Sequence, residues 1–166
     1  IPFVTIDGKD AKDFDDAVFC EFNKDGFNLQ VAIADVAEIV RQDSFIDKEA
    51  LLRGTSIYFP KRVIPMLPEE ISNNLCSLIP NEDRNVLVCK INYSKEGEIN
   101  SYEFSEAVIH SHKRFTYNDV EFIKQNKDIN LSAEILQSLD ALEKLTKQLL
   151  YNLSLIHISE PTRPNC

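Results

Sequence analysis

Short apolar segments separated by polar turns dominate the first 110 residues and are typical of β-strands. The run NLQVAIADVA at residues 28–37 is almost continuous in its apolar character, which predicts a central strand. Polar turns at 23–26 and 94–97 join neighbouring segments into two hairpins. Extended segments are expected at residues 2–6, 16–22, 28–37, 56–59, 85–93 and 98–109.

The last third of the chain has a helical spacing instead. Residues 131–150 carry apolar side chains three and four positions apart, which predicts a helix with one buried face. The stripe lasts less than three heptads, so it indicates core packing rather than a coiled-coil seam. Shorter helices are expected from 44 to 52, from 69 to 73 and from 116 to 125.

Composition places the chain among soluble proteins of ordinary globular type, with 43% hydrophobic and 27% charged residues. No apolar run reaches the roughly 18 residues of a membrane-spanning helix, and no signal-peptide pattern precedes the first strand. The net charge of −9 argues against a generally basic nucleic-acid-binding surface, but it leaves room for an enzyme with a local acidic site. The chain begins at Ile1 without a methionine, so we expect it to be part of a longer protein.

The four cysteines lack the CxxC spacing of a zinc site. Cys20 and Cys89 lie in apolar, strand-like segments and are interpreted as buried thiols. Free thiols fit a reducing, cytoplasmic location.

An acidic cluster near the N-terminus is the strongest sign of chemistry. Asp7, Asp13, Asp15 and Asp16 lie within ten positions, with Asp10 among them. Two unit charges about 4 Å apart repel by roughly 4 kcal/mol at an effective dielectric constant of 20, so a fold that gathers these groups needs a compensating cation. Oxygen ligands suit Mg²⁺ or Mn²⁺. From the residues alone a solvated acidic loop is the preferred interpretation, whereas the spacing of an EF-hand calcium loop is absent.

Residues 153–166, LSLIHISEPTRPNC, resemble the translation of a transposon-end adapter used in sequencing libraries. We therefore expect a biological segment at 1–152 and a foreign tail at 153–166. His157 and Cys166 are left out of any candidate site for this reason.

Three motifs together resemble one enzyme family. The segments TIDGKDAKDFDDAVF, VAIADVAEIV and RGTSIYFPKRVIPMLPEEISNNLCSL follow the order and spacing of the catalytic (RNB) domain of the ribonuclease II and ribonuclease R family, with the closer likeness to the bacterial ribonuclease R branch. The resemblance implies an α+β fold, with a mixed, largely antiparallel β-sheet flanked by helices. Residues 1–152 would be the N-terminal portion of that domain.

The resemblance also implies a function: Mg²⁺-dependent, processive 3′-to-5′ hydrolysis of RNA that releases nucleoside 5′-monophosphates. Asp7 and Asp16 match direct ligands of the better-held metal ion. Asp13 and Asp15 match ligands of a second metal ion or groups that orient the attacking water. Tyr58 matches an aromatic side chain that stacks on the 3′-terminal nucleotide, although a half-buried packing role is the alternative for it.

The implied partner is the 3′ end of single-stranded RNA, bound by a monomer with no membrane association. Flanking cold-shock and S1 modules, and an arginine-bearing motif later in the domain, are expected in the full-length protein. Two other functions stay open: a non-catalytic RNA-binding or scaffold relative, and a domain that a metal ion merely stabilises. Retention of all four aspartates favours the enzyme over the non-catalytic relative.

Overall fold

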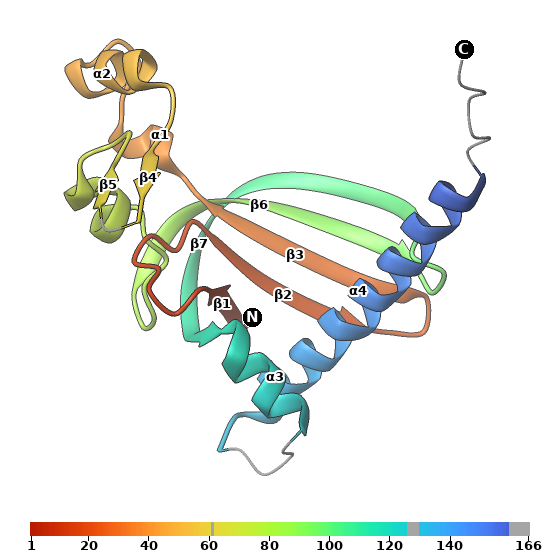
Figure 1. Ribbon diagram of the computed structural model, residues 1–166. Helices are drawn as coiled ribbons and strands as arrows, with labels where there is room; N and C mark the ends of the chain where they lie inside the picture. The colour runs from red at the N-terminus through yellow and green to blue at the C-terminus, as the bar shows by residue number, and fades with distance from the viewer. Residues whose placement is uncertain (61, 126–129, 160–166) are drawn as a thin grey trace, which may run out of the picture.

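A five-stranded closed barrel forms the centre of the molecule in the computed structural model, which describes residues 1–60, 62–125 and 130–159 (Figure 1). Neighbouring strands run in the order β1-β2-β3-β6-β7. All pairs are antiparallel except β1 with β7, which are parallel and close the barrel. The mixed, largely antiparallel sheet is thus confirmed. The strands are β1 Phe3–Asp7, β2 Asp16–Phe22, β3 Gly26–Ala34, β6 Asp83–Ser94 and β7 Ile99–Thr116.

Small and branched apolar side chains fill the barrel. Ala17, Ala32 and Val88 lie opposite one another on three adjacent strands and are buried. Successive side chains of a strand point to opposite faces, so each of these strands sends its alternate residues inward. Ile109 and Phe3 belong to the same buried cluster.

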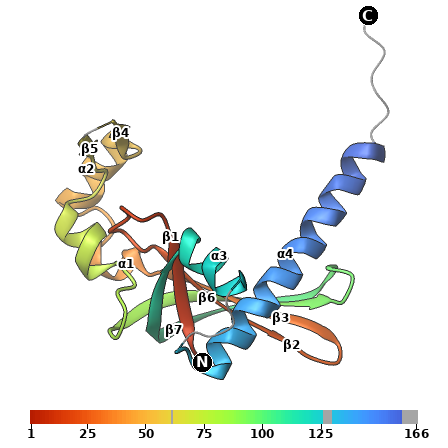
Figure 2. The same ribbon diagram turned by 60° about the horizontal axis from the view of Figure 1, so that its bottom comes forward.

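Helix α4, Ala133–Ser159, crosses the outside of the barrel and packs against β2 (Figure 2). Its buried residues Ile135, Leu139 and Leu145 confirm the predicted apolar face. Buried Ser138 adds a polar contact, because its Oγ accepts a hydrogen bond of 3.0 Å from the Cys20 amide. The shorter helix α3, Tyr117–Gln125, follows directly on β7. Part of the predicted foreign tail, residues 160–166, lies outside the described residues, and the origin of that tail stays a prediction.

A smaller unit stands at the end of the barrel where the β1–β2 connection lies (Figure 1). The predicted helix near residue 44 is confirmed, since the Ser44 hydroxyl accepts a hydrogen bond from the Asp47 amide and Gly54 ends the helix with a left-handed φ of 70°. The elements of this unit are α1 Val36–Ile39, α2 Phe45–Arg53, β4 Ile57–Phe59, β5 Arg62–Ile64 and the π-helix η1 Ile71–Leu75.

Two predicted strand ends were wrong. The strand expected to reach residue 37 ends at Ala34, and Val36–Ile39 forms α1, because a short apolar run does not distinguish strand from helix. The strand expected to end at residue 109 continues to Thr116. Parallel pairing with β1 extends it, and this pairing places Asp7 opposite Thr116.

Candidate active site

The four predicted aspartates lie on one connection and its two ends. Asp7 is the last residue of β1 and Asp16 is the first of β2. Asp13 and Asp15 lie in the intervening residues 8–15, which we call the aspartate loop. The barrel strands therefore fix both ends of the cluster.

The C-terminal half of the aspartate loop is fastened to Ser77 and Leu78, which are fully buried. The Ser77 hydroxyl accepts a hydrogen bond from the Phe14 amide at 3.0 Å and donates one to the Lys12 carbonyl at 3.1 Å. The Leu78 amide donates to the Phe14 carbonyl at 2.8 Å. Three hydrogen bonds thus hold the backbone on either side of Asp13.

The N-terminal half of the loop is held by Arg114 from strand β7. Its Nη2 donates to the carbonyl oxygens of Gly8 at 3.0 Å, Lys9 at 2.8 Å and Ala11 at 3.4 Å. The guanidinium also lies 4.9 Å from the centroid of the Phe14 ring, which is a cation–π distance. One side chain therefore ties together a bend of the loop and the aromatic ring beneath it.

The carboxylates are close enough to disturb one another. Burial, and after it the Asp16 carboxylate, raises the pKa of Asp7, while the Arg114 guanidinium opposes this rise. Burial also raises the pKa of Asp15, with Asp13, Asp16 and Asp7 adding to the effect in that order. The four groups thus form one electrostatic unit.

The donor set fits a hard divalent cation in its chemistry. It consists of carboxylate oxygens, and the Asp7 Oδ2 is buried without a hydrogen-bond partner in the part of the chain that the structure describes. Over the same residues, no three His, Cys, Asp or Glu side chains converge as ligands of one ion. Binding would therefore require the aspartate side chains to rotate toward a shared point.

An open cavity of about 940 Å³ runs between the aspartate loop and the smaller unit. Asp13, Asp15 and Tyr58 all line it, so the structure brings the predicted stacking residue to the same groove as two of the predicted ligands. Tyr58 is 70% exposed, more than a half-buried packing residue would be. Asp10, for which we predict no active-site role, lies exposed along the same groove.

Asp7 and Asp16 do not line this groove. Both lie where the loop joins the barrel. They still interact electrostatically with Asp13 and Asp15, because neighbouring carboxylates of this group help to raise the pKa values of Asp7 and Asp15.

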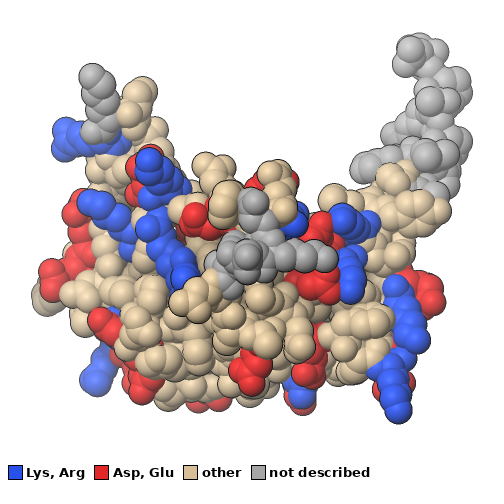
Figure 3. All heavy atoms as spheres, turned by 90° about the horizontal axis from the view of Figure 1, so that it is seen from below, with Lys and Arg blue, Asp and Glu red and all other residues tan. Residues whose placement is uncertain are grey.

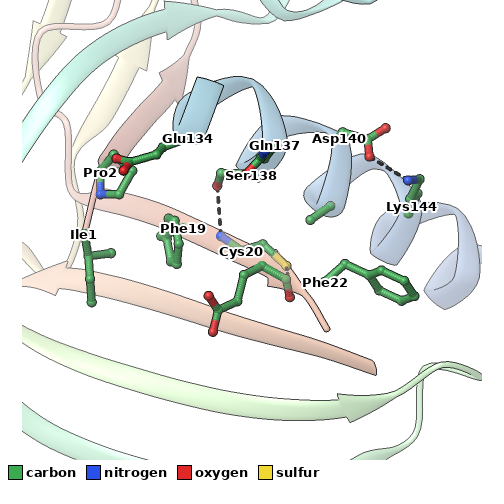
Figure 4. A pocket seen from close by; sticks show the side chains of 12 residues that line it. Ile1, Pro2, Phe19, Cys20, Phe22, Glu134, Gln137, Ser138, Asp140 and Lys144 are labelled. Carbon is green, nitrogen blue, oxygen red and sulfur yellow. Dashed lines mark hydrogen bonds and ion pairs between the residues drawn. The ribbon is translucent and has the colours of Figure 1, made fainter. Parts of the chain in front are cut away.

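A second cavity, of about 560 Å³, lies between β2 and α4 (Figure 4). Two polar contacts lie within its lining: the Cys20 amide donates to the Ser138 hydroxyl, and Lys144 pairs with Asp140 at 2.6 Å. Burial raises the pKa of the Cys20 thiol to about 12, so this thiol is protonated at neutral pH. This cavity offers no activated nucleophile.

Sequence reasoning missed the two residues that hold the loop, Ser77 and Arg114. Each contacts the loop from more than 60 positions away, so no local pattern signals either contact.

Within the described helices, none has both the length and the apolar content needed to cross a bilayer.

Comparisons with known proteins agree on one family. The RNB domain model matches residues 1–154. Ribonuclease R of Vibrio parahaemolyticus serotype O3:K6 is 56% identical over 129 residues, which are 77% of this chain and 15% of that protein. Ribonuclease R of Escherichia coli K12 is 50% identical over 152 residues, which are 90% of this chain and 19% of that protein. The structure of Mycoplasma genitalium RNase R in complex with double-stranded RNA matches with a TM-score of 0.88 and 40% identity, over 92% of this chain and 27% of that one. The chain thus spans less than a fifth of the length of these two curated relatives.

Proposed function

This chain belongs to the RNB-domain family, and from that membership we propose that the full-length protein is a 3′-to-5′ exoribonuclease of the ribonuclease R type. It would hydrolyse single-stranded RNA processively from the 3′ end and release nucleoside 5′-monophosphates. The observation that carries the proposal is the aspartate loop, which presents Asp13 and Asp15 to the groove that Tyr58 also lines.

Asp7, Asp13, Asp15 and Asp16 would hold Mg²⁺, with Mn²⁺ as the alternative ion. A bound divalent cation lowers the pKa of a coordinated water and neutralises charge on a phosphate. The protein's own contribution is positioning, because the barrel fixes Asp7 and Asp16 and the loop holds Asp13 and Asp15 at the groove. Tyr58 would stack on the terminal base and so align the last phosphodiester for attack.

The test is the release of nucleotides by the full-length protein from single-stranded RNA labelled at its 3′ end, with and without Mg²⁺. The 3′ label should appear in nucleoside 5′-monophosphate from the earliest times and only with the metal, and in a parallel reaction with RNA labelled at its 5′ end no fragments of intermediate length should accumulate. If Mg²⁺ raises the melting temperature but no nucleotide is released, the domain is metal-stabilised rather than catalytic. RNA binding without hydrolysis would instead indicate a scaffold relative.

Tyr58→Ala should weaken RNA binding about 5- to 140-fold, because stacking contributes about 1–3 kcal/mol per base. Tyr58→Phe keeps the ring and should bind within about twofold of wild type. The matched control is Tyr102→Ala, since Tyr102 is 66% exposed but lies on β7 away from the groove lining. Equal losses in Tyr58→Ala and Tyr102→Ala, measured by fluorescence anisotropy with a short RNA, would contradict the stacking role.

The chain's surface suggests that other modules supply much of the RNA affinity. On the face drawn in Figure 3, Lys and Arg side chains lie interspersed with Asp and Glu, and the whole chain carries a net charge of −9. RNA binding draws most of its affinity from phosphate neutralisation. Cold-shock and S1 modules elsewhere in a monomeric, cytoplasmic protein are therefore part of this proposal. The free thiols of Cys20, Cys76 and Cys89 support the reducing location.

A further inference from the structure

Arg114 binds the backbone of one short segment, the aspartate loop. Its three hydrogen bonds all leave one nitrogen, Nη2, and all end on backbone carbonyls of the aspartate loop, between 2.8 and 3.4 Å away. Backbone acceptors cannot rotate away as side chains can, so the bonds fix the path of the loop. They span residues 8 to 11, directly after Asp7 and directly before the segment that Ser77 holds.

The strand that carries Arg114 is itself fixed in the barrel. Arg114 pairs with Thr5 in the parallel β1–β7 ladder, and Thr5 is fully buried. Phe115, the next residue, is buried in the core beneath α4. The arginine therefore projects from a fixed strand, and the loop rather than the strand is the part that its hydrogen bonds restrain.

We propose that Arg114 is a positioning residue, which clamps residues 8–11 and so keeps Asp7 and Asp13 in place for the divalent cations that the four aspartates would hold. The inference rests on the proposed function for the effect on catalysis. The effect of Arg114 on Mg²⁺ binding can be measured without RNA. Arg114 contacts the loop backbone and would not itself be a ligand of the ion. Residues that orient metal ligands typically change metal affinity or activity by about 10–100-fold when they are replaced.

The experiment uses the full-length protein with Arg114→Met, which keeps an unbranched apolar stem over Phe14 but removes the charge and the hydrogen bonds. Two midpoints are measured in Mg²⁺ titrations: that of nucleotide release, and that of the rise in melting temperature without RNA. Both should move to about 10–100-fold higher Mg²⁺. Affinity for a short RNA in EDTA should stay within about threefold of wild type.

Arg114→Lys tests whether the hydrogen bonds are needed in addition to the positive charge. It also replaces Arg114→Met in the experiment if the methionine variant does not fold. Lysine keeps the charge, but its nitrogen stops short of the position of Nη2. Its two midpoints should lie between those of wild type and of Arg114→Met. Lys144→Gln, which removes a positive charge from α4 beside Phe22, at the end of β2 opposite Asp16, is the charge control and should leave both midpoints unchanged.

Several outcomes would overturn the clamp. Unchanged Mg²⁺ midpoints in both arginine variants would do so, and so would wild-type midpoints in Arg114→Lys, because charge alone would then suffice. Loss of RNA affinity with an unchanged thermal midpoint would assign Arg114 to phosphate binding instead. If wild type releases no nucleotide, the proposed function fails, yet the thermal titration still decides whether Arg114 organises a metal site.

Discussion

Asp15→Asn in the full-length protein should lower the rate of nucleotide release by about 10²–10³-fold or more while RNA still binds. Asparagine keeps the shape of the side chain but removes a charge from the unit formed by the four aspartates. Losing one preorganised electrostatic group at a reaction centre costs about this much. Single-turnover release of labelled nucleotide measures the rate, and RNA binding in EDTA shows that the groove is intact. A variant that hydrolyses RNA near the wild-type rate would refute the assignment of Asp15.

The same variant should be more stable than wild type when no divalent cation is present. Burial and three neighbouring carboxylates raise the pKa of Asp15, so the folded state binds its proton more tightly than the unfolded state does. The ionised group therefore destabilises the fold above the raised pKa, and this penalty disappears as pH falls below the ordinary aspartate value. Melting in EDTA should show a higher midpoint for Asp15→Asn at pH 7, and the advantage should shrink on acidification.

Asp10→Asn is the matched control because Asp10 lies in the same loop, is exposed and is predicted to have no active-site role. Its rate should stay within about threefold of wild type. A loss as large as that of Asp15→Asn would mean that the fifth aspartate also takes part, and that the four-residue assignment is incomplete.

Gly26→Ala should destabilise the barrel by about 3 kcal/mol or more, a combination of backbone strain and overpacking. Gly26 has a φ of 144°, and a Cβ there would lie 2.1 Å from the Tyr93 carbonyl oxygen and 2.7 Å from the Ser94 carbonyl carbon. Both atoms are backbone of β6, paired with the start of β3, so no side-chain rotation relieves the clash. The melting temperature should fall by roughly 6–12 °C.

Gly54→Ala measures the cost of a left-handed backbone conformation without a steric clash. Gly54 also has a left-handed φ, of 70°, but nothing lies within 4 Å of a Cβ built there. The substitution should cost only the conformational penalty of about 1–2 kcal/mol. If both alanine variants melt at the same temperature, close approach of β6 is not the reason for glycine at position 26.

The strands were predictable where local pattern decides them. The strand 16–22 was predicted with the bounds that it has, because a polar turn follows directly at 23–26. The helix beginning at Phe45 also has local signals, a capping residue at Ser44 and a glycine at 54. Closure of the barrel was not predictable in this way, because the β1–β7 pairing joins residues more than 100 positions apart.

The candidate site likewise contains residues that local sequence indicates and residues that reach it from distant positions. The aspartates are candidates because they are close in sequence and match the motif of the family, and Tyr58 is a candidate because it lies in another motif of the family. The contacts of Ser77 and Arg114 depend on strands and turns meeting in space, and a serine or an arginine is ordinary in any surface segment. Prediction from one sequence therefore finds the acids of this site but not the residues that hold them.

The parallel pairing of the first and last barrel strands also has a consequence for synthesis. The aspartates are made first, but Arg114 is translated 106 residues after Gly8, which it contacts. At about 5–20 residues per second, the ribosome takes roughly 5–20 s to add that stretch. A nascent chain that has not yet reached β7 carries all four acids with neither the closed barrel nor the arginine beside them. The order of synthesis thus delays assembly of the site until the barrel strands are complete.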